Sequence, residues 1–162
     1  MMNHDFWLLE EQARASLNDL NYASRRDAPV KIHEDHLRYL ADTLAWVPTS
    51  NPAKQNEPGY GLNWWGPTII DQQGGLLFAQ IIATWAQLFS YGPAMLKLRG
   101  LFSWQVPLEQ VTYSLNEDQS DQPKSYDYPE IERDGLVLAL TTLAQFGQQA
   151  ATREFFILHT GI

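Results

Sequence analysis

A long uncharged stretch constrains the fold of this chain more than any other feature of the sequence. No Asp, Glu, Lys or Arg occurs among the 25 residues between Asp71 and Lys97, a length that nominally suffices to cross the ~30 Å hydrocarbon core of a bilayer. Polar side chains nevertheless recur on one stripe of the helix that this stretch predicts, namely Gln73, Gln80, Thr84 and Gln87. Gly92 and Pro93 then end the helix early. We therefore expect a buried helix of a water-soluble fold over residues 73–91, and no membrane partner.

The composition indicates an ordinary globular protein without a cofactor. The 162 residues are 44% hydrophobic and 19% charged, which lies outside the weakly hydrophobic, highly charged range of disordered chains. We expect a single globular domain over residues 1–162. The absence of cysteine excludes disulfides, thiolate nucleophiles and cysteine-ligated metal sites. The first residues lack the basic region of a secretory signal peptide, so we expect a cytoplasmic protein.

The periodicity of the apolar residues predicts four helices. Apolar side chains three or four positions apart predict helices over residues 6–20 and 29–47, which would form an N-terminal helical hairpin. The uncharged helix at 73–91 comes third, with Asp71 as a cap, and a last helix is expected at 135–150 with Asp134 as a possible cap.

Strands and loops account for the remaining segments. Short apolar or alternating runs predict strands at 67–70, 96–106, 110–115 and 154–160. Polar residues, proline and glycine predict loops at 48–61 and 116–134. The order of these elements favours the α+β class, with about four helices packed on a small, mostly antiparallel sheet.

Negative charge is concentrated in the last third of the chain. The whole chain has a net charge of −8, and residues 109–162 contribute −6 of it, with nine acidic and three basic side chains. Such a surface attracts basic partners and repels phosphate, so we expect a protein partner and no nucleic acid. Tyrosines in the acidic loop are typical interface anchors. The predicted partner-binding residues are Asp118, Asp121, Tyr126, Asp127, Tyr128 and Glu130.

Two simpler interpretations compete with this hypothesis. An acidic loop also serves merely to keep a small protein soluble. The helix from Leu76 to Phe89 is apolar nearly all round, so a homo-oligomer that buries this helix against its copy is a further interpretation. In size, acidity and aromatic content the chain is similar to bacterial immunity and antitoxin-type binding proteins. This similarity is one of composition, implies a non-enzymatic binding role and assigns no residue.

An alternative interpretation places a small-molecule site among aromatic residues of the loop before residue 67. An aromatic shelf for a flat or sugar-like ligand would consist of Tyr60, Asn63, Trp64 and Trp65. Large aromatic residues in a small domain are more often part of the core, however.

The histidines offer only weak indications of catalysis or metal binding. His33 and His36 lie three positions apart on a predicted helix, close enough to share a metal if a carboxylate completes the coordination shell. Partly buried structural histidines near a helix start are the more common case. His159 lies between apolar residues of the last strand and is interpreted as a core residue. The absence of a Gly-x-Ser-x-Gly motif favours a non-enzymatic protein. The alternative is a small-molecule-binding protein or an enzyme that uses the aromatic shelf, with His33 and His36 as its metal site.

Overall fold

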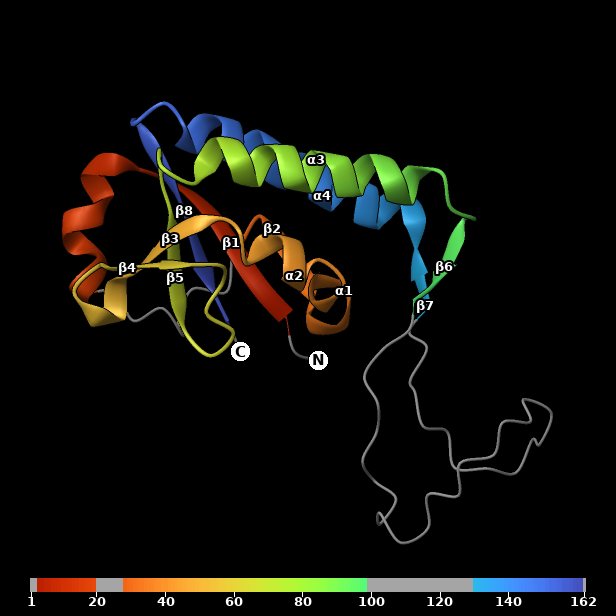
Figure 1. The fold of residues 1–162 in the computed structure, drawn as a ribbon, viewed down its shortest axis with the longest axis horizontal. Helices are drawn as coiled ribbons and strands as arrows, with labels where there is room; N and C mark the ends of the chain where they lie inside the picture. The colour runs from red at the N-terminus through yellow and green to blue at the C-terminus, as the bar shows by residue number, and fades with distance from the viewer. Residues whose placement is uncertain (1–2, 20–27, 99–129, 162) are drawn as a thin grey trace, which may run out of the picture.

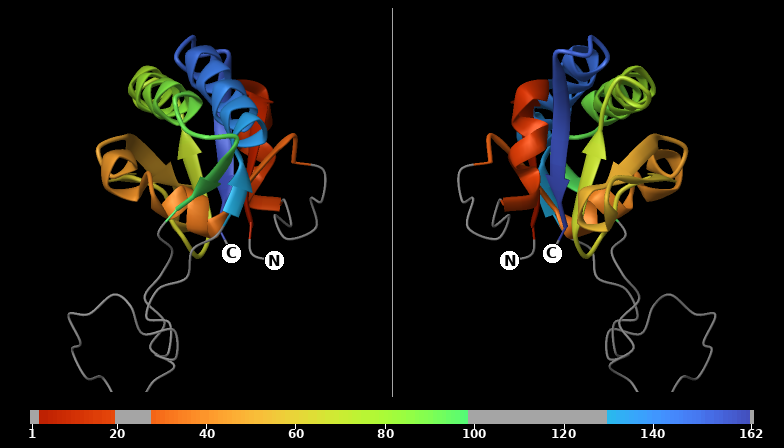
Figure 2. Two further views of the ribbon diagram at one scale, coloured as in Figure 1. Left: turned by 90° about the vertical axis from the view of Figure 1, so that its right-hand side faces the viewer. Right: turned by 90° about the vertical axis from the view of Figure 1, so that its left-hand side faces the viewer.

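The computed structural model describes residues 3–19, 28–98 and 130–161 and shows an α+β fold (Figure 1). Its centre is a six-stranded sheet in which all neighbouring strands are antiparallel. In spatial order the strands are β2 (Val30–His33), β1 (Asn3–Glu10), β8 (Phe155–Thr160), β5 (Pro67–Ile70), β3 (Pro48–Asn51) and β4 (Glu57–Tyr60). Figure 2 shows helices α3 (Gly75–Ser90) and α4 (Arg133–Ala150) side by side over one face of this sheet.

Strand β8 occupies the middle of the sheet, and both of its faces are covered. It pairs with β1 on one side and with β5 on the other. Ile157 belongs to the large core that includes α3 and α4, whereas Phe156 and Leu158 belong to a second cluster with Leu17 of the 3-10 helix η1 (Glu11–Asp19). A strand buried on both faces has no apolar alternation. The prediction of a covered or centrally paired last strand is therefore confirmed.

Small residues allow α3 and α4 to approach each other closely. A Cβ atom added to Gly147 of α4 would lie 2.8 Å from the carbonyl oxygen of Gly75 and 2.9 Å from the Cβ of Ala79. The two helices also bury six large side chains, each of which stabilises the fold by roughly 1.5–3 kcal/mol relative to exposure. These side chains are Phe78, Ile82, Phe89, Leu136, Leu140 and Leu143.

The two long helices confirm the sequence prediction to within two residues at each end. Asp71 accepts the N–H of Gln73 at 3.0 Å in the turn before α3, but the N-cap of α3 is Gly74, without a side-chain hydrogen bond, so the prediction of Asp71 as this cap was wrong. At α4 the side chain that caps the helix is Glu132, whose Oε2 accepts the N–H of Gly135 at 2.8 Å. The prediction of Asp134 as this cap was wrong by two positions.

The predicted N-terminal helical hairpin is absent, and the described chain begins with a strand. Residues 3–10 form β1, which pairs with β8 over six residues and with β2 over four. The run from Phe6 to Leu9 satisfies the helical spacing, yet a strand with two covered faces shows the same unbroken apolar run. In the second predicted helix, residues 30–33 form β2 and only two short helices follow, α1 (Glu34–Arg38) and α2 (Ala41–Leu44).

The predicted loop at 48–61 is a β-hairpin in the structure. Strands β3 and β4 pair over four residues around the short 3-10 helix η3 (Pro52–Lys54), and Gln55 and Asn56 adopt left-handed backbone conformations between them. Its polar composition misled the prediction because β4 is an edge strand whose four residues are all exposed. Edge strands tolerate the proline and glycine that central strands exclude.

A two-stranded ribbon extends from the far ends of α3 and α4. β6 (Met95–Lys97) pairs with β7 (Glu130–Glu132), at the opposite end of the helices from η1 (Figure 1). The predicted strand at 96–106 is described only up to Leu98, and the predicted strand at 110–115 lies outside the described residues. Within the described ranges, no helix has both the length and the apolar character that crossing a membrane requires.

Candidate functional site

The predicted partner-binding segment is described only at its end. Five of its six residues lie outside the described ranges, namely Asp118, Asp121, Tyr126, Asp127 and Tyr128. Glu130 lies on β7, where its Oε1 is 2.8 Å from the Nζ of Lys97 on the paired strand β6. This carboxylate raises the pKa of Lys97, first through the hydrogen bond and then through its charge.

The neighbouring carboxylates are also engaged within the chain. Glu132 caps α4 through the N–H of Gly135, and Arg133 Nε donates to Asp134 Oδ1 at 2.7 Å. Exposed ion pairs of this kind contribute little stability, but each cation offsets part of the negative charge that a partner would meet. The acidic segment, residues 117–134, is therefore partly neutralised at its described end by cations of the same chain.

The predicted aromatic shelf divides into inward and outward side chains. Trp64 packs inward, with its ring 4.7 Å from that of His4 at nearly a right angle and 5.5 Å from the Arg38 guanidinium. Trp65 and Tyr60 are 76% and 75% exposed. The four residues of the predicted shelf therefore do not form one surface. Trp64 packs against the core, as expected for a large aromatic residue in a small domain.

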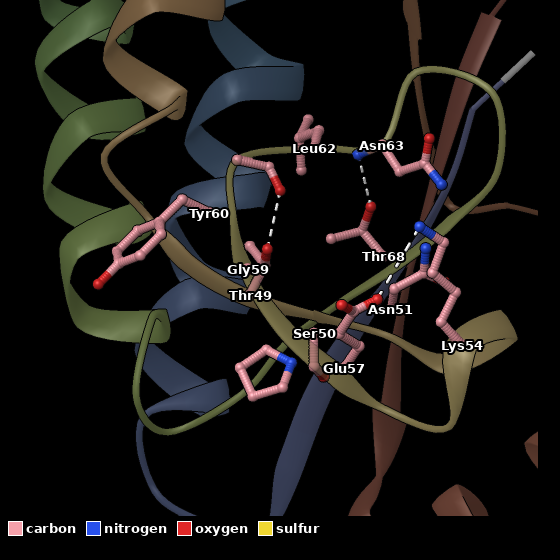
Figure 3. Close-up of a pocket in the computed structure, with 12 residues that line it drawn as sticks. Thr49, Ser50, Asn51, Lys54, Glu57, Gly59, Tyr60, Leu62, Asn63 and Thr68 are labelled. Atoms are coloured by element: carbon pink, nitrogen blue, oxygen red, sulfur yellow. Dashed lines mark hydrogen bonds and ion pairs between the residues drawn. The ribbon is translucent and has the colours of Figure 1, made fainter.

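Tyr60 and Asn63 line a cleft of about 210 Å³ beside the β3–β4 hairpin (Figure 3). Many of its polar groups already have partners within the chain. The Thr49 hydroxyl donates to the Gly61 carbonyl at 2.9 Å, and the N–H of Asn63 donates to Thr68 Oγ1 at 2.8 Å. Figure 3 shows Tyr60 on the opposite side of the cleft from the ion pair of Lys54 and Glu57. The cleft therefore leaves few groups free to orient a ligand.

His33 and His36 line a different groove, of about 350 Å³, between β2 and the start of α4. Their ring centroids are 5.4 Å apart, yet no third metal-ligating side chain joins them in the described part of the chain. His33 is the N-cap of α1, and its Nδ1 accepts the N–H of Asp35. Burial and the nearby His33 lower the pKa of His36, against a smaller opposing effect of Asp35. The arrangement is that of a helix start with structural histidines.

A chain of buried polar side chains crosses the middle of the sheet, and the sequence did not predict it. His4 Nδ1 and His159 Nε2 share a hydrogen bond of 2.8 Å, and His159 Nδ1 lies 3.4 Å from Thr68 Oγ1. Both histidines are 0% exposed and Thr68 is 2% exposed. A hydroxyl beside two imidazoles has the composition of a catalytic relay, but no substrate reaches atoms buried to this degree.

Burial also determines the charge state of this pair. It lowers the pKa of His4 to about 4, with further contributions from the charges of Arg38 and His33. Burial and the adjacent His4 lower the pKa of His159 well below its ordinary value. Two neutral rings share one hydrogen, whereas two protonated rings would direct N–H groups at each other. The pair is a neutral structural contact near neutral pH.

Similarity to known proteins contributes nothing to the choice among these sites. Models of protein families, curated proteins and solved structures all fail to match this chain.

The outer surface of α3 and α4, termed here the helical face, is a feature that the sequence indicated only in part. No charged residue occurs in 72–96 or in 135–152, and α3 and α4 bring these two runs side by side (Figure 2). Its large exposed apolar side chains are Leu76, Leu77, Leu88, Tyr91 and Leu138. The first run was recognised from the sequence. The second was available in the same way, but only the topology joins the two.

Proposed function

We propose that this protein is a non-enzymatic interaction protein that binds a basic protein partner through its acidic segment, with Tyr126 and Tyr128 as anchors. The observation that carries the proposal is the charge of −6 in residues 109–162, out of −8 for the whole chain. A concentrated field of one sign raises the association rate with a surface of opposite sign. Tyrosine side chains then supply contact area at low entropic cost.

The contacts at the described end of the acidic segment indicate which of its carboxylates attract the partner. Glu130, Glu132 and Asp134 each have a partner within the chain, so they add less to the attraction than their number suggests. Residues 117–127 contain four carboxylates and one lysine, a net charge of −3. We therefore assign the attraction chiefly to these four carboxylates, which are Glu117, Asp118, Asp121 and Asp127.

The experiment compares two variants of the full chain that have the same net charge. The first replaces the four carboxylates of residues 117–127 with their amides. The matched control replaces four exposed carboxylates elsewhere, namely Glu10, Asp42, Glu57 and Glu154. Crosslinking of the unaltered chain in cell extract identifies partners, and association rates are then measured with each purified partner at several salt concentrations.

The expected result is a partner with a basic surface whose association slows by about tenfold or more in the first variant at low salt. The control should associate at nearly the rate of the unaltered chain, and added salt should remove the difference. Equal association rates for the two variants would show that the acidic segment does not guide binding. The absence of any partner whose binding depends on residues 117–127 would equally overturn the proposal.

A further inference from the structure

The exposed part of the helical face is unusual in its lack of charge. The nearest charged residues along the two helices are Asp71 and Lys97 at the ends of one run, and Asp134 and Arg153 at the ends of the other. Protein surfaces commonly carry about a quarter to a third charged residues of both signs. Apolar side chains stand in their place, with Leu88 55% and Leu138 68% exposed. Exposed uncharged polar side chains, among them Gln80, Gln87 and Gln145, complete the surface. Exposed apolar side chains on a face without charge are typical of an interaction site.

Three hydroxyl groups on the exposed side of the two helices are already paired within their own helices. The hydroxyls of Thr84 and Thr141 donate to the carbonyls of Gln80 and Val137, at 2.8 and 2.7 Å. On the same helix as Thr84, the Ser90 hydroxyl donates to a carbonyl at 2.6 Å. Hydroxyls that are satisfied in this way lose little when water is removed from them. These hydroxyls can therefore be dehydrated at a low free-energy cost, whereas exposed amides such as those of Gln80 and Gln145 need hydrogen-bond partners across an interface.

The charge of the chain selects the occupant of this face. A basic partner finds no complementary charge there, and a helix that lies on a membrane needs the lysine and arginine rim that this face lacks. Two copies of this chain, each with a net charge of −8, repel each other in most relative orientations. An uncharged surface is compatible with its own copy across a two-fold axis, because the two-fold places no like charges opposite each other.

We infer that the helical face of α3 and α4 is the interface of a two-fold symmetric homodimer. With 16 residues, α3 is about 24 Å long, and two helices packed 8–10 Å apart form a face about 20 Å wide. Each copy then contributes about 480 Å², so the dimer buries about 1,000 Å² in total, close to the lower limit for specific interfaces. This size predicts a reversible dimer that dissociates on dilution. The inference is independent of the proposed function, since it concerns a different surface.

The test measures the mass of the full chain by sedimentation between about 5 and about 500 µM, because a reversible dimer depends on concentration. The mass should rise from 18.5 kDa toward twice that value. Higher salt should strengthen the dimer, since it screens repulsion between two acidic copies. The basic partner of the proposed function shows the opposite dependence on salt, so failure of one idea is distinguishable from failure of the other.

Leu88→Asp and Leu138→Asp each place a carboxylate on the helical face, and each should raise the dimer dissociation constant by about 30-fold or more. Tyr60→Asp is the matched control, because Tyr60 is 75% exposed on β4, and it should leave the constant nearly unchanged. Amide exchange of the unaltered chain gives a second measurement without any substitution. Peptides from residues 76–91 should become better protected as concentration rises.

Three results would overturn the inference. One is a mass that stays at that of a single chain over the whole concentration range. Another is a dimer whose dissociation constant both aspartate variants leave unchanged, whatever the effect of Tyr60→Asp. The last is a monomer that floats with phosphatidylcholine and phosphatidylglycerol vesicles and loses this binding in Leu88→Asp, which would identify the helical face as a membrane surface.

Discussion

Acidification should destabilise this protein through the buried pair of His4 and His159. Both rings are neutral in the folded chain, because burial lowers the pKa of His4 from 6.5 to about 4 and that of His159 well below 6.5. In the unfolded chain both rings titrate near 6.5. The unfolded chain therefore takes up protons first as the pH falls. The contribution of the pair is complete above pH 6.5 and is lost between there and about pH 4.

The size of the effect follows from the shift of the His4 pKa from 6.5 to about 4. At about 1.4 kcal/mol per pKa unit, this shift corresponds to about 3 kcal/mol of unfolding free energy. The unfolding free energy should fall by up to about 1.4 kcal/mol per pH unit for one histidine, and more steeply where His159 titrates as well. Because domains of this size are stable by only about 5–15 kcal/mol, the loss is a large share of the total.

Urea denaturation followed by tryptophan fluorescence, at pH values from about 7.5 down to about 5, measures this slope. The variant His4→Gln keeps a polar partner for His159 but does not titrate at this position, so it should start less stable and lose less stability on acidification. The comparison variant His33→Gln removes only the last and smallest of the three causes that lower the pKa of His4, so its slope should lie much closer to that of the unaltered chain than the slope of His4→Gln does. Identical slopes for His4→Gln and the unaltered chain would refute the reasoning and assign the acid sensitivity to carboxylates.

Two further predictions concern contacts of α3. Gly147→Ala should destabilise the fold by about 1–3 kcal/mol in urea denaturation, because the added methyl group meets the backbone and Cβ of Ala79 at 2.9 Å. The control Gly59→Ala has nothing within 4 Å of its added methyl group and should be neutral or slightly stabilising. Equal losses in the two variants would contradict the close packing of the helices. Trp85→Phe should cost about 1 kcal/mol by the same assay, because the indole N–H donates to Thr43 Oγ1 at 2.9 Å, and a Thr43→Val variant should lose a similar amount without adding to it in the double variant.

The parts of the fold with a strong local signal were predictable from the sequence. The long helices show apolar periodicity over four turns or more, and Pro67 to Ile70 is a short β-branched run between turn residues. Each signal depends only on neighbouring residues of one segment. In these segments the tertiary packing favours the same structure as the local signal. The N-terminal strand lacked such a signal, because Phe6 and Trp7 face opposite clusters and leave no alternation.

The interactions between distant segments could not be predicted in the same way. His4 and His159 are separated by 155 positions, and their contact depends on the exact register of β1 against β8. A slip of one residue would turn each side chain to the other face of the sheet. The division of the aromatic set has a similar origin, since adjacent residues in the turn at Trp64 and Trp65 point in different directions.

The central position of β8 has a consequence for how the chain folds during synthesis. β8 joins the pair β2–β1 to the group β5–β3–β4, and it follows all of them in the sequence. Until the ribosome releases residues 155–160, β1 and β5 each keep an open edge that other nascent chains can pair with. Sheet closure therefore waits for the last strand to be translated, and a ribosome that stalls before it would leave an aggregation-prone intermediate.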